Sequence, residues 1–263
     1  MTTPPGPLTI VSRDNPLIKR LRLLAHDSTA YRKQGQVWLE GAHLCQALLA
    51  RGGRPALALF TESHWPQADQ ALRQATPRVH LVPDALMATI SGLESPAPMG
   101  FLWDLPPEVR LQMGVASVVL DRLQDAGNVG SILRSAAAMG FGQVLAIKGT
   151  AALWSPKVLR SGMGAHFSLN LVEGLSHNEI AAIGLPLLVT SSHEGDFLHR
   201  AELPWPCAWV LGHEGQGVAA ALAKLAARSV RIAQPGGEES LNVAAAAAIC
   251  LHASAATRSA LSL

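Results

Sequence analysis

Short apolar runs of strand length recur through the second half of the chain, and helical patterns separate most of them. The runs fall at 116–120, 143–147, 167–172, 187–190, 208–211 and 230–232. After the last run, the chain ends in an alanine-rich helical pattern over about 242–257. Short buried strands that alternate with helices are typical of a parallel sheet covered on both faces. We therefore predict an α/β domain with a parallel sheet over residues 113–263.

The first part of the chain has the pattern of a smaller α/β unit. Asn15-Pro16 is typical of a helix start, because asparagine is a good cap and proline fits the first helical position. Predicted helices lie at 16–25, 42–50, 68–75 and 84–90, and predicted strands at 36–40, 56–60 and 79–82. Prolines between Ser95 and Pro107 break both patterns, although 101–103 could still pair as a strand. The predicted boundaries are a first domain at 1–95, a linker at 96–112 and a second domain at 113–263.

Composition narrows the class of protein. The 263 residues, 49% of them hydrophobic, are enough for a substantial core in one or two domains. No apolar run reaches the roughly 20 residues that span a bilayer, and the proline-rich stretch 1–7 does not resemble a signal peptide. Cys45, Cys207 and Cys250 stand far apart, so we expect reduced core thiols in a cytoplasmic protein. The net charge of +2 gives little support by itself for nucleic-acid binding.

Ligands of parallel α/β sheets bind beyond the carboxyl ends of the strands, so the segments after predicted strands are the first candidates. In one of them Gly127, Asn128 and Gly130 open a helix that carries Arg134. Backbone amides and an arginine at a helix start favour a phosphate or ribose site. A glycine turn with a solvated arginine is the alternative. A dinucleotide-binding loop is disfavoured, because the G-x-G-x-x-G spacing is absent and the next strand ends at Lys148 rather than at an acidic residue.

Two further segments follow predicted strands. Three glycines within 212–217 let the backbone pass close to a ligand, with Glu214 among them. A common surface turn is the alternative. After the last strand, a Pro-Gly-Gly turn at 235–237 leads to Ser240 and Asn242. Ser240 could simply cap the last helix, which does not exclude a role in the site.

Together these segments resemble the SpoU (TrmH-like) family of RNA 2′-O-ribose methyltransferases, within the SPOUT superfamily. The likeness lies in N-x-G-x-x-x-R at 128–134, L-G-x-E-x-x-G at 211–217, and I-x-x-P-(x)-E-S-L-N-V ending at Val243. A fourth segment, 155–166, is also similar. The first domain resembles the family's ribosomal-protein-like RNA-binding domain at 12–16, 39–41 and 94–96.

The resemblance implies a trefoil-knotted C-terminal domain that binds S-adenosylmethionine, and a homodimer formed through that domain with the catalytic arginine near the partner subunit. It implies that Arg134 is the central catalytic residue, as an orienting charge or as a true base. By position it implies further catalytic residues and a set of cofactor-binding residues. The catalytic candidates are Arg134, Asn128, Glu214, Ser240 and Asn242, and the cofactor candidates are Gly212, Ile232, Leu241, Ser191 and Gly217.

The sequence says less about the RNA partner than about the cofactor. The resemblance favours phosphate contacts by the basic residues of the first helix region: Arg13, Lys19, Arg20 and Arg22. Large-subunit ribosomal RNA is favoured over transfer RNA as the substrate. A non-catalytic RNA-binding protein of the same fold and a nicotinamide enzyme are the rival classes. The ten histidines show no metal-ligand spacing, so we expect no metal.

Overall fold

The computed structural model describes residues 6–191, 194–236 and 240–260. These residues form two compact units: the chain up to Pro107 together with Trp154–Phe167, and Glu108–Leu153 together with the chain from Ser168 onward. Gly237 and Glu239, which belong to the third glycine-rich segment and its motif, lie outside the described residues. Within the described ranges, no helix has both the length and the apolar character that a bilayer crossing needs.

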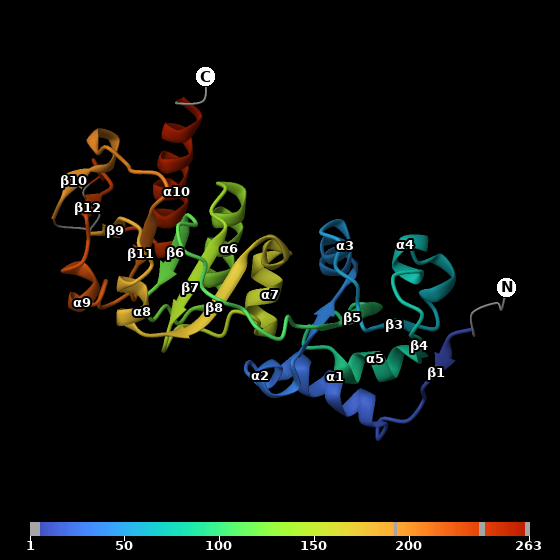
Figure 1. Ribbon diagram of the computed structural model, residues 1–263. Helices are drawn as coiled ribbons and strands as arrows, with labels where there is room; N and C mark the ends of the chain where they lie inside the picture. The colour runs from blue at the N-terminus through green and yellow to red at the C-terminus, as the bar shows by residue number, and fades with distance from the viewer. Residues whose placement is uncertain (1–5, 192–193, 237–239, 261–263) are drawn as a thin grey trace. The chain divides into compact units, whose positions relative to one another are not determined.

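The first unit is built on a sheet with the strand order β1-β4-β3-β5-β2 (Figure 1). The strands are Leu8–Thr9 (β1), Gln36–Glu40 (β2), Leu57–Thr61 (β3), Val79–Val82 (β4) and Met99–Asp104 (β5). The helices are Pro16–His26 (α1), Ala30–Gln34 (α2), Ala42–Ala50 (α3), Gln70–Arg73 (α4), Asp84–Ile90 (α5) and Pro156–Gly162 (α7). The small α/β unit predicted for this region is confirmed.

The start of α1 shows how local sequence sets the element. The side-chain oxygen of Asn15 accepts a hydrogen bond from the backbone N–H of Leu17 at 2.9 Å, and Pro16 occupies the first turn. Asparagine satisfies an amide that would otherwise lack a partner, and proline has no amide to leave unsatisfied. Ile18 and Leu21 are then fully buried against the sheet. The predicted cap and helix are both confirmed.

Strand β5 corrects the predicted linker at 96–112. It pairs antiparallel with both β2 and β3, so it lies inside the first sheet. The prolines flank this segment rather than interrupt it, and every residue from Met99 to Trp103 therefore keeps a backbone N–H for pairing. Gly100 also packs closely, since a Cβ atom there would lie 2.4 Å from the Trp38 ring.

The second unit contains a sheet with the strand order β10-β12-β9-β11-β6-β7-β8. Every pairing in it is parallel, as the sequence predicted. The strands are Ser117–Leu120 (β6), Gln143–Ile147 (β7), Asn170–Leu175 (β8), Leu187–Thr190 (β9), Asp196–Phe197 (β10), Ala208–Leu211 (β11) and Arg228–Arg231 (β12). The helices are Ala126–Ala138 (α6), His177–Ala181 (α8), Ala220–Ala223 (α9) and Val243–Ala260 (α10).

One strand of the second unit begins later than the hydrophobic pattern indicated, and another begins earlier. The run 167–172 was expected to be a strand, but Ala165–Ser168 forms a 3-10 turn and β8 starts at Asn170. The run 230–232 corresponds to β12, which begins at Arg228. A charged residue at a strand end does not contribute to an apolar run, so the pattern alone missed this start.

The strand order brings the site together. β11 lies between β9 and β6, and β12 lies on the far side of β9. Because all these strands are parallel, their carboxyl ends lie at one edge of the sheet, where the segments that follow them can meet. Helices α6 and α10, which follow β6 and β12 along the chain, pack side by side (Figure 1). The first turns of both helices can therefore contribute side chains to the same place.

The three cysteines are free and buried, as predicted for core thiols. Burial raises the pKa of the Cys207 thiol to about 11 and that of Cys250 to about 12. Thiols with such pKa values remain protonated near neutral pH and behave as small apolar groups.

Candidate active site

A cavity of about 390 Å³ opens at the carboxyl ends of β9, β11 and β12. This volume lies within the range of about 300–1,000 Å³ that small-molecule sites occupy. Its wall includes all the residues predicted to bind the cofactor: Ser191, Gly212, Gly217, Ile232 and Leu241. Three predicted catalytic residues also line it, namely Glu214, Ser240 and Asn242. Segments that are far apart in the sequence thus form one wall.

The loop after β11, residues 212–218, folds back tightly on itself. His213 and Gly217 exchange two backbone hydrogen bonds, at 3.1 Å and 2.8 Å. The backbone passes so close to itself that a Cβ atom on Gly212 would lie 2.2 Å from the carbonyl carbon of Gly217. Only glycine fits such an approach without displacing the backbone. The 212–218 loop therefore presents Glu214 at its tip.

A chain of side-chain hydrogen bonds links three predicted catalytic residues. The amide nitrogen of Asn128 donates to Oε1 of Glu214 at 3.3 Å. The amide nitrogen of Asn242 donates to Oδ1 of Asn128 at 3.0 Å. This Glu214–Asn128–Asn242 chain joins the 212–218 loop, the start of α6 and the start of α10. Because an amide nitrogen only donates and an amide oxygen only accepts, these bonds fix the orientation of the Asn128 side-chain amide.

Helix caps hold the two asparagines in place. Asp125 caps α6 by accepting from the backbone N–H of Asn128 at 2.7 Å. Oδ1 of Asn242 accepts from the backbone N–H of Ala244 at 2.9 Å. Ser240 had been considered as the cap of the last helix, but α10 begins at Val243 and the cap is Asn242. Ser240 lies before the helix, exposed at the cavity wall.

Arg134 lies on α6, which also carries Asn128, but it is exposed. In the part of the chain that the structure describes, it is not among the residues that line the cavity. The sequence grouped Arg134 with Glu214 and Asn242 as one catalytic set. The structure brings the latter two together through Asn128 and leaves the arginine outside this cavity wall.

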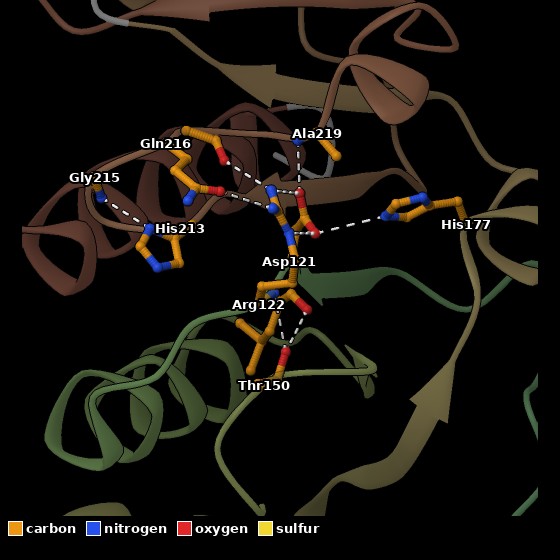
Figure 2. Close-up of polar contacts among 10 residues, drawn as sticks. Asp121, Arg122, Thr150, His177, His213, Gly215, Gln216 and Ala219 are labelled. Atoms are coloured by element: carbon orange, nitrogen blue, oxygen red, sulfur yellow. Dashed lines mark hydrogen bonds and ion pairs between the residues drawn. The ribbon is translucent and has the colours of Figure 1, made fainter.

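Asp121 and Arg122 form an ion pair directly after β6 that the sequence left unassigned (Figure 2). Asp121 is fully buried, and its Oδ2 accepts from the backbone N–H of Ala219 at 2.7 Å. Nε of Arg122 donates to Oδ1 of Asp121 at 2.9 Å, and His177 Nε2 lies 3.7 Å from the same oxygen. Burial acts to raise the pKa of Asp121, but the bonds from Arg122 and Ala219 outweigh it and hold this pKa below its ordinary value.

The side chain of Gln234 lines the cavity and carries a buried polar atom. Oε1 of Gln234 is enclosed, and no hydrogen-bond donor reaches it among the described residues. A buried acceptor left unpaired costs about 1–3 kcal/mol, so this oxygen, on a side chain that lines the cavity, is a candidate acceptor for a ligand that donates a hydrogen bond. Beside it, Val230, Ile232 and Leu241 supply apolar surface. The cavity therefore suits a ligand with an apolar body and a hydrogen-bond donor at its edge.

The basic residues predicted to contact RNA belong to the first unit, and most make bonds within it. Arg13 is exposed, and Lys19 forms an ion pair with Asp14 at 3.1 Å. Nη1 of Arg20 donates to Gln36 at 3.2 Å. Arg22 is half-buried and donates to the backbone oxygen and the hydroxyl of Thr89, at 3.0 Å and 2.9 Å. Arg22 therefore joins α1 to α5, while the other three keep exposed charge.

Comparisons with known proteins show what this chain is similar to. The model of the SpoU rRNA methylase family matches residues 116–252. An uncharacterized tRNA/rRNA methyltransferase of Synechocystis sp. is 34% identical over 260 residues, 93% of this chain and 92% of the relative. The 23S rRNA (guanosine(2553)-2′-O)-methyltransferase of Bacillus subtilis is 28% identical, covering 92% of this chain and 97% of its own length. A solved RNA 2′-O ribose methyltransferase has a TM-score of 0.78 at 30% identity, covering 95% of this chain and 99% of that one.

Proposed function

The chain belongs to the SpoU rRNA methylase family, and from that premise we propose that it transfers a methyl group from S-adenosylmethionine to a ribose 2′-hydroxyl of RNA. One observation carries the proposal. The Glu214–Asn128–Asn242 chain has Glu214 and Asn242 in the wall of a cavity that also holds every residue that the resemblance named for the cofactor. A binding cavity and a fixed polar array beside it are what a group transfer requires.

The residues present fit the cofactor. The enclosed oxygen of Gln234 can accept a hydrogen bond from an amino group such as that of adenine. The apolar side chains of Ile232 and Leu241 can cover the faces of a purine ring. Backbone at Gly212 and Gly217 leaves room for polar contacts with the remainder of the molecule. When bound, S-adenosylmethionine supplies an electrophilic methyl group on a sulfonium sulfur.

The protein's own side chains orient the acceptor. Arg134 carries a permanent charge, because guanidinium stays protonated in proteins. We propose that it holds the ribose hydroxyl and a neighbouring phosphate, and stabilises the negative charge that develops on the attacking oxygen. The hydroxyl proton leaves to solvent water as the oxygen–methyl bond forms, and its abstraction by Arg134 itself is the less favoured form. Asn128, held by Glu214 and Asn242, positions the ribose, and Ser240 lies at the cavity wall within reach of a substrate.

A homodimer accounts for the position of Arg134. This arginine is exposed on α6, outside the wall of the cavity in the described part of a single chain. We propose that two copies associate through the second unit, so that Arg134 of one completes the site of the other. A trefoil knot formed by the segments after β11 and β12 is part of the same proposal. The test mixes an Arg134→Ala protein with a Gly212→Ala protein at a cofactor concentration below the wild-type Kd, where each alone is expected to have strongly reduced activity. Restored activity on mixing supports the shared site, and no restoration contradicts it.

Large-subunit ribosomal RNA is the favoured substrate, in the cytoplasm, with transfer RNA as the alternative. The support is the family itself and the full-length similarity to a 23S rRNA 2′-O-methyltransferase. The first compact unit would bind RNA through phosphate contacts by Arg13, Lys19 and Arg20. Such contacts weaken as salt rises.

The direct test is transfer of labelled methyl from S-adenosylmethionine into ribosomal and transfer RNA that lacks the modification. The wild-type protein is expected to label ribosomal RNA, and Arg134→Ala to lose at least about 100-fold in rate, as for removal of an oriented charge in a transition state. Arg134→Lys keeps the charge but lacks the planar fork. Near-normal turnover of Arg134→Lys would contradict the orienting role. A wild-type protein that binds RNA but transfers no methyl group would favour the non-catalytic alternative.

A further inference from the structure

Arg122 directly follows β6 and has a backbone conformation that side chains rarely adopt. Its φ is +61°, in the left-handed region. Glycine adopts this region freely, whereas any residue with a Cβ atom is strained there. Strained residues of this kind persist where surrounding contacts hold them, and they gather at functional sites. The contacts of Arg122 should therefore reveal what holds it in this conformation.

Those contacts lead to the 212–218 loop, as Figure 2 shows. Nη1 of Arg122 donates to Oε1 of Gln216 at 3.0 Å, and Nη2 reaches the backbone oxygen of Gly217 at 3.5 Å. Nε and Nη2 of the same guanidinium donate to the two oxygens of Asp121, at 2.9 Å and 3.3 Å. One planar group therefore joins a buried carboxylate to two consecutive residues of the loop. Lysine has no comparable fork and could not make all these bonds at once.

Backbone bonds complete the arrangement around Arg122. Its own N–H donates to the hydroxyl of Thr150 at 3.1 Å, and that hydroxyl donates to the backbone oxygen of Leu120 at 2.9 Å. Asp121 accepts from the N–H of Ala219, just after the loop. Hydrogen bonds at Gln216, Gly217 and the adjacent Ala219 thus connect the second half of the 212–218 loop to the residues that follow β6. Neither Asp121 nor Arg122 is among the described residues that line the cavity.

We propose that Arg122, held by Asp121, is a positioning residue that keeps the 212–218 loop in its binding conformation before the cofactor arrives. The inference rests on the proposed function, because it treats this loop as part of the S-adenosylmethionine site. Gly212, Glu214 and Gly217 of the loop line the cavity. A loop that is already ordered loses less conformational freedom on binding, so preorganisation raises affinity. The strained backbone of Arg122 is retained because its side chain gives this order.

The substitution Arg122→Gly separates positioning from simple stability. It removes the guanidinium, and it also removes the backbone strain, so the two effects on thermal unfolding oppose each other. Met163→Gly is the matched control, because Met163 is also a non-glycine residue with positive φ, at +49°. Met163 lies in the first compact unit and does not belong to the described cavity wall. Gln216→Ala is a milder second variant that keeps the Arg122–Asp121 pair.

Two readouts test the proposal on the full chain. Amide hydrogen exchange over 212–219, measured without cofactor, reports the order of the loop. Calorimetry with S-adenosylmethionine reports affinity. For Arg122→Gly we expect faster exchange in this segment and a Kd raised about tenfold, which corresponds to about 1.4 kcal/mol. Gln216→Ala is expected to shift both readouts in the same direction but less, and Met163→Gly to shift neither.

The outcomes separate this inference from the function on which it rests. Unchanged exchange in Arg122→Gly overturns the inference whatever the affinity, and so does faster exchange with wild-type affinity. Equal loosening of the loop in Met163→Gly also overturns it, because the effect would then not be specific to Arg122. A wild-type protein that binds no S-adenosylmethionine contradicts the proposed function, and this inference with it. Normal wild-type binding with an unaffected Arg122→Gly variant overturns the inference alone.

Discussion

Gly212→Ala tests whether close backbone packing shapes the proposed cofactor site. The added methyl carbon would lie 2.2 Å from the carbonyl carbon of Gly217 and 2.2 Å from the nitrogen of Val218. Carbon atoms make favourable contacts at roughly 3.5–4.0 Å, so the two strands of the loop must separate by about 1 Å or more. Both neighbours are backbone atoms, which cannot rotate away as a side chain could.

That separation has a cost that can be worked out. The hydrogen bonds between His213 and Gly217, at 3.1 Å and 2.8 Å, would be stretched beyond a useful length. Overpacking of this kind destabilises proteins by about 1–3 kcal/mol. A central value of about 2 kcal/mol lowers Tm by roughly 4–8 °C in a chain of this size. Because the displaced loop lines the cavity, we also expect the Kd for S-adenosylmethionine to rise at least about tenfold.

Gly215→Ala is the control within the same loop. A Cβ atom on Gly215 would meet its nearest neighbours, atoms of the His213 ring, at 3.8 Å, which is ordinary contact. Its stability should stay within about 1 kcal/mol of wild type. Thermal unfolding and calorimetry of both variants provide the comparison. The reasoning is refuted if Gly212→Ala melts and binds like wild type, or if Gly215→Ala loses as much.

Three further predictions concern the polar groups of the site. Asn128→Asp places a carboxylate beside Glu214, so it should reduce the rate of methyl transfer at least as much as Asn128→Ala does. Adding Glu214→Gln to Asn128→Asp restores a hydrogen-bond donor and should recover part of that rate. No recovery would argue against the Glu214–Asn128 bond. Gln234→Leu removes the buried unpaired acceptor, so it should stabilise the cofactor-free protein by about 1 kcal/mol and weaken cofactor binding. Thermal unfolding measures the stability and calorimetry the affinity. A variant that loses both stability and affinity would contradict the assignment of Gln234 as a cofactor acceptor. The pKa of Asp121 is lower in the folded protein than its ordinary 3.8, so Asp121 stabilises the fold fully above that value and loses this contribution as pH falls through the lower folded pKa. The deficit of Asp121→Asn in urea unfolding should therefore shrink between pH 7 and pH 3, and a constant deficit would contradict the assignment.

The family resemblance named Glu214, Asn128 and Asn242 as catalytic candidates, and the strand pattern supplies a physical reason why their segments lie together. Parallel strands bring their carboxyl ends to one edge of a sheet, so polar segments after different strands can be grouped without a structure. The apolar runs were sufficient to find most of the strands of the second unit. They did not reveal β10, the pair Asp196–Phe197, because two residues carry no periodicity.

Other features depended on contacts that local patterns do not contain. The residues around Asp121 and Arg122 carry no pattern that indicates the burial of Asp121 or the bond from Arg122 to Gln216, 94 residues away. The family resemblance favoured RNA contact by the basic residues of the first helix region, and the sequence did not show that Arg22 donates to Thr89, 67 residues away. The cap of α10 shows a smaller limit. Ser240 and Asn242 are both good capping residues, and only the helix start at Val243 decides between them.

The measurement that tests the central claim most directly is the chemical position of the transferred methyl group. The full-length protein is incubated with methyl-labelled S-adenosylmethionine and ribosomal or transfer RNA, and the RNA is digested completely to nucleosides for mass spectrometry. Our account predicts label in a single 2′-O-methyl nucleoside of ribosomal RNA, absent with Arg134→Ala. Label on a base would contradict transfer to the ribose, and no label in either RNA, together with no binding of S-adenosylmethionine, would contradict the proposed enzyme.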